Sequence, residues 1–335
     1  MLSYGKEILV IILAITVCFA STTNHVQAAS LLEIVLYTNS PVYWLADPIT
    51  VYGYLFYNST TVSDGIVCMQ IDNPLHYPIL FRTLPTGTPP STPESIEITS
   101  LFLSDNFGKP KSTVMRNTIA YFNITLKNNN ATKLNFNFTI SCFDSAQGII
   151  DSNYFATSLL AHDTNTMVIP FYLPDRVPTG SAIAYANTFT KQPKDGGYAI
   201  SKEKSATFTI TSIAGFSAQG QAQTLAAEGG VHAMAGTFAT QFKIPIYHIP
   251  GIGNYTIYTS SRYRNQLAKA QTQIRLKVAD LNGDNKVNVL DLIIIANNIG
   301  WTGPPGGIPA DVNADGKVNV LDLVITVRFF GWVGS

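Results

Sequence analysis

Residues 280–303 read DLNGDNKVNVLDLIIIANNIGWTG, and residues 311–334 read DVNADGKVNVLDLVITVRFFGWVG. Shifted by 31 residues, the two segments agree at 14 of 24 positions. Each segment carries Asp or Asn at relative positions 1, 3, 5, 9 and 12, the spacing at which a calcium-binding loop presents side-chain oxygens. Calcium prefers six to eight oxygen ligands, and a loop that turns alternate side chains inward meets this requirement. The repeat therefore predicts two calcium-binding loops, each followed by a helix.

The predicted ligands are the side-chain oxygens at those five positions and the backbone carbonyl at position 7, as in an EF-hand loop. In the first loop they are Asp280, Asn282, Asp284, the carbonyl of Lys286, Asn288 and Asp291. In the second loop they are Asp311, Asn313, Asp315, the carbonyl of Lys317, Asn319 and Asp322. Position 6 has to turn with a positive φ, and Asn285 and Gly316 are residue types that tolerate this conformation. Two calcium ions are expected, one in each loop.

The segments after the loops, residues 289–299 and 320–330, are predicted helices that are apolar on most faces. Such helices are not stable alone in water, so we expect them to pack on each other. Trp301 and Trp332 follow a glycine at equivalent places after each helix, and we expect them to cover the two helix ends rather than to bind a ligand.

A duplicated loop with one helix per loop and Asp at position 12 resembles the type I dockerin, over about the last 57 residues, 279–335. The resemblance implies two antiparallel helices, one calcium ion per loop and a cohesin domain as partner. Dockerins occur on secreted polysaccharide-degrading enzymes and on surface proteins. Familiar dockerins carry small hydroxyl residues at positions 10 and 11, which contact the cohesin. Here these predicted partner-binding positions hold Val289, Leu290, Val320 and Leu321, so we expect a cohesin-like partner with an apolar face.

The N-terminus has the features of a signal peptide. Lys6 precedes an apolar run from Ile8 to Ala20, and small residues flank Gln27 at the end of the following polar stretch. This pattern predicts a signal peptide at residues 1–28, cleaved on export, and therefore a secreted or cell-surface protein. An uncleaved N-terminal anchor is the alternative. No later segment is long and apolar enough to cross a membrane.

The composition agrees with export and argues against nucleic acid as a partner. Lys and Arg together number 21, Asp and Glu together 21, and charged residues make up 13% of the chain. This balance offers no basic surface for a phosphate backbone. Five N-x-[ST] sequences are candidate glycosylation sites, the alternative being ordinary Asn/Thr-rich strands. They are Asn58, Asn123, Asn130, Asn137 and Asn254.

Between the two ends, short runs of Val, Ile, Thr, Tyr and Phe are broken every eight to twelve residues by turn formers, which is typical of antiparallel β-sandwiches. Residues 31–93 resemble the opening half of secreted immunoglobulin-like domains of the macroglobulin type. Residues 94–214 resemble immunoglobulin-like domains of archaeal and bacterial surface proteins. Residues 215–278 supply closing strands only.

Half a sandwich would leave an apolar sheet face uncovered. We therefore expect residues 31–93 and 215–278 to form one discontinuous immunoglobulin-like sandwich, with 94–214 inserted as a second. Three consecutive domains are the alternative. The predicted fold is mostly β: two sandwiches followed by a small all-α calcium-binding module. The combination resembles secreted prokaryotic proteins, archaeal ones in particular.

The mature chain keeps two cysteines, Cys68 and Cys142, which is too few for a disulfide-scaffolded small domain. We expect two separate buried thiols, a single bridge being the alternative. The mature histidines match no zinc-binding spacing, and no hydrolase elbow or nucleotide-binding loop occurs. These are His76, His162, His232 and His248.

A non-catalytic attachment protein is thus the leading hypothesis. Carboxylates in the sandwiches mostly lie in turn sequences such as Asp64-Gly65, but glycoside hydrolysis needs only two carboxylates that meet in space. A polysaccharide-degrading enzyme or carbohydrate-binding accessory of a cellulosome-like complex stays open, as does a self-associating surface protein. Five aromatic residues crowd the first sandwich, and cross-strand packing is their expected use, with a carbohydrate platform as the alternative. They are Tyr43, Trp44, Tyr52, Tyr54 and Tyr57.

Overall fold

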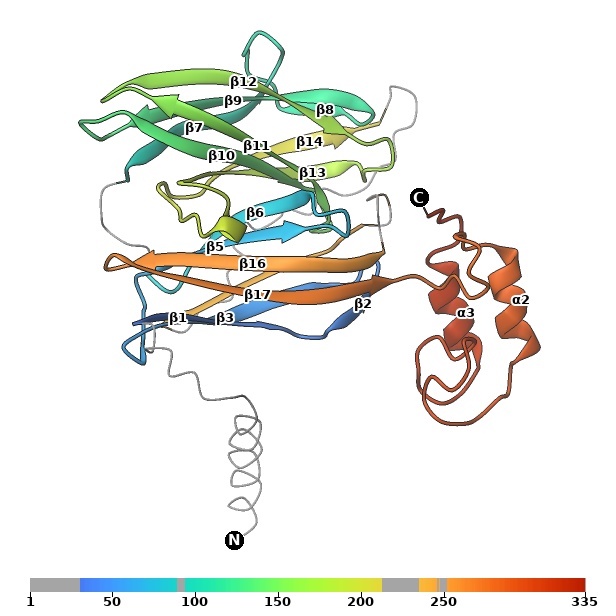
Figure 1. Cartoon of the computed structure of the whole chain (residues 1–335). Coiled ribbons are helices and arrows are strands. Elements are labelled where there is room, and N and C mark those ends of the chain that lie inside the picture. The colour runs from blue at the N-terminus through green and yellow to red at the C-terminus, as the bar shows by residue number, and fades with distance from the viewer. Residues whose placement is uncertain (1–30, 89–93, 213–234, 246, 248–251, 335) are drawn as a thin grey trace, which may run out of the picture. The chain divides into compact units, whose positions relative to one another are not determined.

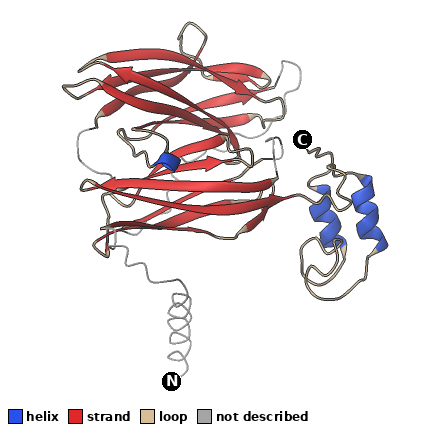
Figure 2. Cartoon of the chain, viewed as in Figure 1, coloured by secondary structure: helices blue, strands red, loops and turns tan. Residues whose placement is uncertain are grey.

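Four β-sheets and two short C-terminal helices account for most of the part of the chain that the structure describes, which confirms the predicted mostly-β class (Figure 1, Figure 2). The structure, a computed structural model, describes residues 31–88, 94–212, 235–245, 247 and 252–334. From Leu32 onward these residues belong to one compact unit. The predicted signal peptide, His232 and His248 lie outside the described residues.

The first sandwich contains β1 (Leu32–Thr38), β2 (Val42–Trp44), β3 (Ile49–Tyr57), β4 (Thr60–Thr61), β5 (Ile66–Asp72), β6 (Pro78–Pro85), β15 (Thr237–Phe242), β16 (Gly253–Tyr263) and β17 (Gln266–Lys277). The second contains β7 (Ile96–Ser104), β8 (Thr113–Met115), β9 (Thr118–Asn128), β10 (Leu134–Phe143), β11 (Ile149–Leu159), β12 (Thr164–Leu173), β13 (Gly180–Phe189) and β14 (Lys204–Thr211), with the 3₁₀ turn η1 (Pro193–Asp195) before β14.

Both sheets of the first sandwich combine strands from early and late in the chain. One sheet has the order β1-β3-β15, with β4 also on β3, and the other has the order β2-β17-β16-β5-β6. The late strand β15 pairs antiparallel with β3, and β16 pairs antiparallel with β5. Period-2 alternation along β3 buries Val51 and Leu55. Gly53 lies between them because a Cβ there would meet the Val35 carbonyl oxygen and the ring of Phe238.

The second sandwich stacks the sheet β11-β10-β13-β14-β8 against the sheet β12-β9-β7. Its core is rich in phenylalanine. The Phe122 ring meets Phe171 and Phe208 edge-on at centroid distances of 6.0 and 5.4 Å. Edge-to-face pairs of this kind add roughly 0.5–1.5 kcal/mol beyond the burial of the rings.

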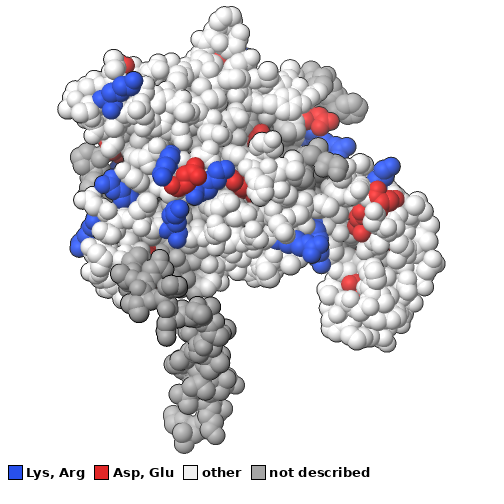
Figure 3. Space-filling view, viewed as in Figure 1, with Lys and Arg blue, Asp and Glu red and all other residues white. Residues whose placement is uncertain are grey.

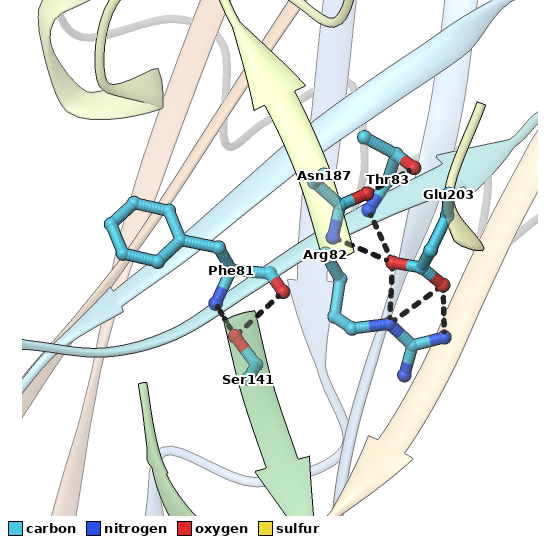
Figure 4. A network of polar contacts seen from close by, with 6 residues as sticks. All are labelled: Phe81, Arg82, Thr83, Ser141, Asn187 and Glu203. Carbon is cyan, nitrogen blue, oxygen red and sulfur yellow. Dashed lines mark hydrogen bonds and ion pairs between the residues drawn. The ribbon is translucent and has the colours of Figure 1, made fainter. Parts of the chain in front are cut away.

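Strand β6 joins the two sandwiches through a polar network (Figure 4). The Arg82 guanidinium forms an ion pair of 2.9 Å with Glu203, although both side chains are only about one-sixth exposed. The Thr83 N–H donates to Glu203 at 3.1 Å, and the Phe81 N–H donates to Ser141 Oγ at 3.0 Å. β6 is the outer strand of its sheet. The Glu203 and Ser141 side chains therefore accept hydrogen bonds from backbone N–H groups that an unprotected edge strand would offer to other chains.

The two thiols are free and buried, in β5 and β10. Burial raises the pKa of the Cys68 thiol to about 12, so it is uncharged at neutral pH.

The C-terminal helices α2 (Val289–Asn297) and α3 (Val320–Val327) end two and three residues before the predicted boundaries. The backbone turns after each helix, and Gly300 and Gly331 take positive φ angles of 89° and 83°. Glycine adopts this conformation at little cost, which makes it the usual helix terminator. None of the helices in the described residues has both the length and the apolar character needed to span a membrane.

Candidate calcium loops and docking surface

The first carboxylate of each loop organises the loop's backbone. Asp280 accepts hydrogen bonds of 2.9 Å from the N–H groups of Gly283 and Asn285. Asp311 likewise accepts from position 6, the Gly316 N–H, at 3.0 Å, and its other two N–H donors are Asp315 at 3.1 Å and Gly306 at 2.8 Å.

The predicted positive φ at position 6 is confirmed, with 61° at Asn285 and 83° at Gly316. Gly316 is also sterically required, because a Cβ there would lie 2.6 Å from the Gly303 carbonyl oxygen.

The carboxylate at position 12 closes each loop onto the start of its helix. Asp291 accepts from the Leu281 N–H at 2.7 Å and from the Asn288 N–H at 2.8 Å. Asp322 makes the same two contacts, with Val312 at 2.8 Å and Asn319 at 2.9 Å.

Both position-12 carboxylates have 0% exposure, and no ion pair within the described residues reaches either of them. A buried carboxylate that has only N–H partners is stabilised further by a nearby cation, so these groups suit a metal loop.

Position 9 has a role that spacing alone did not indicate. The Asn288 side chain accepts from the Leu290 N–H at 2.8 Å, and Asn319 accepts from the Leu321 N–H at 2.8 Å. With the aspartate three residues later, each Asn forms a capping box at the helix N-terminus. The N-x-x-D sequence in both repeats was the signal that could have shown it.

The remaining ligand candidates also repeat their contacts. The Asn282 amide donates to Asp284 at 3.0 Å, and the Asn313 amide donates to Asp315 at 3.0 Å. In the described part of the chain, no three His, Cys, Asp or Glu side chains lie close enough to hold a metal by themselves. The loops would therefore need Asn oxygens and a backbone carbonyl beside their carboxylates, which is the mixed oxygen set that calcium accepts.

Each helix end is tied to the opposite loop. The Val318 N–H donates to the Trp301 carbonyl at 3.0 Å, and the Val287 N–H donates to the Trp332 carbonyl at 2.9 Å. Gly300 and Gly331 donate back to the same two valines at 2.9 and 2.8 Å. The two loop-helix repeats therefore support each other, and distortion of one loop is transmitted to the end of the other helix.

The predicted partner-binding residues are exposed. Val289, Leu290, Val320 and Leu321 are 50–65% exposed, which is unusual for side chains of this size and polarity. Three more exposed residues extend the same faces and were missed, although spacings of four and seven residues along a helix could have identified them. These exposed apolar residues are the candidate docking surface: Val289, Leu290, Ile293, Val320, Leu321, Val324 and Val327.

The five glycosylation candidates lie in different environments. Asn58 and Asn254 are exposed, whereas Asn130 and Asn137 are half-buried. Asn123 is buried, and its amide donates to the Gly108 carbonyl at 3.5 Å.

The aromatic cluster that the sequence suggested does not lie on one surface. Tyr43 is buried, Trp44 lies under the Lys277 ammonium at 4.0 Å, and Tyr57 meets Tyr263 edge-on at 5.6 Å. Tyr52 and Tyr54 are exposed on the opposite face of β3 from Val51 and Leu55.

The two described histidines, His76 and His162, are exposed in turns with φ angles of 64° and 58°. They do not come together at a site.

A pair of mutually supporting loop-helix repeats with oxygen-rich loops defines a calcium-dependent docking module. Residues 278–331 match the family model of the dockerin type I domain, so the C-terminal part of the chain carries a dockerin, as its sequence predicted. Dockerin domains bind calcium and imply a cohesin partner. Proteins with dockerins are typically extracellular or on the cell surface.

No curated protein matches the chain. Among solved structures, the C-terminal domain of wzt is similar with a TM-score of 0.31 and 10% identity, over 37% of this chain and 78% of that one. Alkylpurine DNA glycosylase AlkC of Pseudomonas fluorescens, bound to DNA containing an abasic site analog, gives a TM-score of 0.27 and 12% identity, over 36% of this chain and only 31% of that one. A CARDB domain from Pyrococcus furiosus, in complex with di-metal ions, gives 0.23 and 11%, over 36% of this chain and 88% of that one. Such weak likenesses assign neither a fold nor an activity.

Proposed function

We propose that this is an exported, non-catalytic attachment protein whose dockerin binds two calcium ions and docks to a cohesin-like partner with an apolar face. The observation that carries the proposal is that the contacts of positions 3, 9 and 12 repeat between the two loops, together with the exposed apolar residues at the start of both helices. Because each loop has its own buried carboxylate, at Asp291 and Asp322, each has its own need for a cation.

The residues that would hold calcium are the side chains at positions 1, 3, 5, 9 and 12 and the position-7 carbonyls of Lys286 and Lys317. A bound calcium ion supplies positive charge that offsets repulsion among the carboxylates. The chain's own backbone N–H groups orient those carboxylates, and the position-12 aspartates connect loop geometry to the helix starts. The docking surface lies on these helices, so its arrangement depends on the loops.

The sandwiches serve as binding or spacer modules in this proposal. Pairing of β15 with β3 and of β16 with β5 supports a discontinuous first sandwich, residues 31–93 plus 215–278, that carries residues 94–214 as an insertion. Export through the predicted signal peptide, glycosylation and a secreted or surface location belong to the same proposal. Charged side chains are few on the face shown in Figure 3, and those near its centre alternate between Lys or Arg and Asp or Glu, so they form no basic surface for nucleic acid.

The test is retention of the full-length chain on immobilised cohesin domains, with calcium and with EDTA. We expect retention in calcium only. Replacing Val289, Leu290, Val320 and Leu321 together by Ser should weaken it at least about tenfold, because each buried Val or Leu side chain contributes roughly 1.5–3 kcal/mol.

The matched control is Leu75→Ser, which alters a similarly exposed apolar side chain in the loop after β5 and should leave retention unchanged. The proposal would be contradicted if retention were the same in calcium and in EDTA, or if the four-serine variant were retained as well as the parent. Calcium-dependent self-association without cohesin binding would favour a surface protein that crosslinks its own copies.

A further inference from the structure

The outer face of the sheet β1-β3-β15 carries a row of aromatic side chains that the docking function does not use. Along β3 the outward residues alternate with the buried ones and include Tyr52, Tyr54 and Phe56. Register places Tyr37 of β1 beside Tyr52, and Thr237 of β15 beside Tyr54. The tyrosine face is made up of Glu33, Val35, Tyr37, Thr50, Tyr52, Tyr54, Phe56, Thr237, Ala239 and Gln241.

The rings of this face are arranged as stacked pairs that remain open to solvent. Tyr37 and Tyr52 stack with centroids 5.6 Å apart and planes at 28°, and Tyr54 stacks with Phe56 at 5.9 Å and 22°. The three tyrosines are 38–46% exposed, and no hydrogen bond joins their hydroxyls to another described residue. The face therefore offers apolar rings together with hydroxyl groups that no other described residue engages.

The charge of the face limits what it can bind. Glu33 is the one charged residue of the tyrosine face, and the face contains no Lys or Arg. Proteins that stack nucleic acid bases on aromatic rings also need cations along the phosphate backbone. A neutral ligand suits this face better than an anionic one.

The size of the face argues against a second copy of the chain. Three strands about 4.8 Å apart and a row of four outward residues about 20 Å long give an area of roughly 300 Å². A stable protein interface needs roughly 800 Å² from each partner. The dimensions are those of a site for a narrow, extended ligand.

One end of the face continues into a hollow. Gln241, which donates from Nε2 to Thr50 Oγ1 at 3.2 Å, also lines a cavity of about 620 Å³. The same cavity is lined by the polar residues Asn39 and Ser40 and by one charge of each sign, Lys277 and Asp47, of which Asp47 is paired with Arg328 at 2.7 Å. An extended ligand on the tyrosine face would therefore meet polar groups at this end.

We propose that the tyrosine face binds a neutral polysaccharide chain, laid along β3 with one end in the hollow. Sugar rings present C–H groups on their faces and hydroxyls on their rims. The C–H groups pack on the negative faces of aromatic rings, and the hydroxyls bond to side chains such as Gln241 and to the tyrosine hydroxyls. The inference does not rest on docking, since every residue of the tyrosine face belongs to the first sandwich; only the hollow is linked to the dockerin, through the ion pair of Asp47 with Arg328.

The experiment measures retention of the full-length chain on insoluble cellulose and its retardation in gels that contain xylan, mannan or mixed-linkage β-glucan, with anionic polygalacturonate as a comparison. We expect binding to at least one neutral polysaccharide, and a loss of about tenfold or more in the double variant Tyr52→Ala, Tyr54→Ala. Tyr172→Ala, at a tyrosine of β12 that is even more exposed, at 57%, should bind like the parent. Tyr52→Phe with Tyr54→Phe keeps the rings and should retain most of the binding, and thermal unfolding checks that each variant is folded.

No binding to any neutral polysaccharide, or undiminished binding by the folded double-alanine variant, would overturn the proposal. Binding to polygalacturonate alone would overturn it as well. EDTA separates this function from docking: polysaccharide binding should persist in EDTA while cohesin binding is lost, and the double-alanine variant should still bind cohesin. Complete loss of polysaccharide binding when calcium is removed would contradict the inference, because the aromatic rings that should hold the ligand all lie in the first sandwich.

Discussion

Buried carboxylates occur both in the dockerin and at the junction of the sandwiches, but their countercharges have different sources. Glu203 at the junction is paired with Arg82, which lies 121 residues away in the sequence. Asp291 and Asp322 in the dockerin accept only backbone N–H groups from 3 to 10 residues away and have no cationic partner among the described residues. The junction is thus electrostatically complete within the chain, whereas the dockerin depends on a cation from outside.

Removal of calcium should therefore affect the two regions very differently. When the free calcium concentration is a thousand times the Kd, each bound ion stabilises the folded dockerin by about 4 kcal/mol, which gives about 8 kcal/mol for two sites. We expect EDTA to unfold residues 279–334 and leave the sandwiches folded. Limited proteolysis, read by mass spectrometry, would show cleavage confined to the C-terminal segment, and far-UV circular dichroism would show loss of helix only.

EDTA already saturated with calcium is the control and should change nothing. If the dockerin resists proteolysis equally with and without calcium, the proposed dependence on an external cation is wrong.

The dockerin was predictable because its determinants are local. Ligand spacing, the turn residues Asn285 and Gly316 and both helices all lie within 24-residue segments, so periodicity and residue type were enough to predict them. The helix ends were placed too late because Gly300 and Gly331 bend the chain toward the opposite loop, a contact between repeats that neither repeat shows alone.

The sandwiches were predictable only in class. Period-2 alternation, which indicated the strands, does place Val51 and Leu55 on the opposite face of β3 from Tyr52 and Tyr54. The ion pair between Arg82 and Glu203 could not be predicted from sequence periodicity, because it depends on how the two sandwiches pack against each other. The stacking of Tyr37 on Tyr52 likewise depends on the β1–β3 register, so sequence proximity grouped Tyr52 with Tyr43 instead.

Removing the Arg82 guanidinium should destabilise the junction between the two sandwiches. In Arg82→Ala the Glu203 carboxylate stays largely buried without its partner, and loss of one member of a buried ion pair typically costs about 3–5 kcal/mol. We expect a fall of this size in the free energy of unfolding of the sandwiches, measured by urea denaturation in calcium.

Lys202→Ala is the matched control, because Lys202 forms a longer, more exposed pair with Glu94 at 3.8 Å and should contribute less than about 1 kcal/mol. Arg82→Met combined with Glu203→Leu removes both charges and should recover much of the lost stability. An Arg82→Ala variant as stable as Lys202→Ala would show that the junction does not rely on this pair.

A smaller effect separates helix capping from calcium binding within the dockerin. Asn288 and Asn319 cap their helices through Leu290 and Leu321, and replacing an Asn cap by Ala typically costs about 1 kcal/mol. We expect Asn288→Ala and Asn319→Ala each to lower the thermal stability of the dockerin in saturating calcium by about this amount, with no change in the sandwiches.

Ser at the same positions should restore the cap. If Ser restores stability but calcium titration still shows weaker binding, position 9 is a ligand as well as a cap. If Ser restores both the stability and the calcium affinity, position 9 acts only as a helix cap, and the other positions of the loop hold the calcium ion.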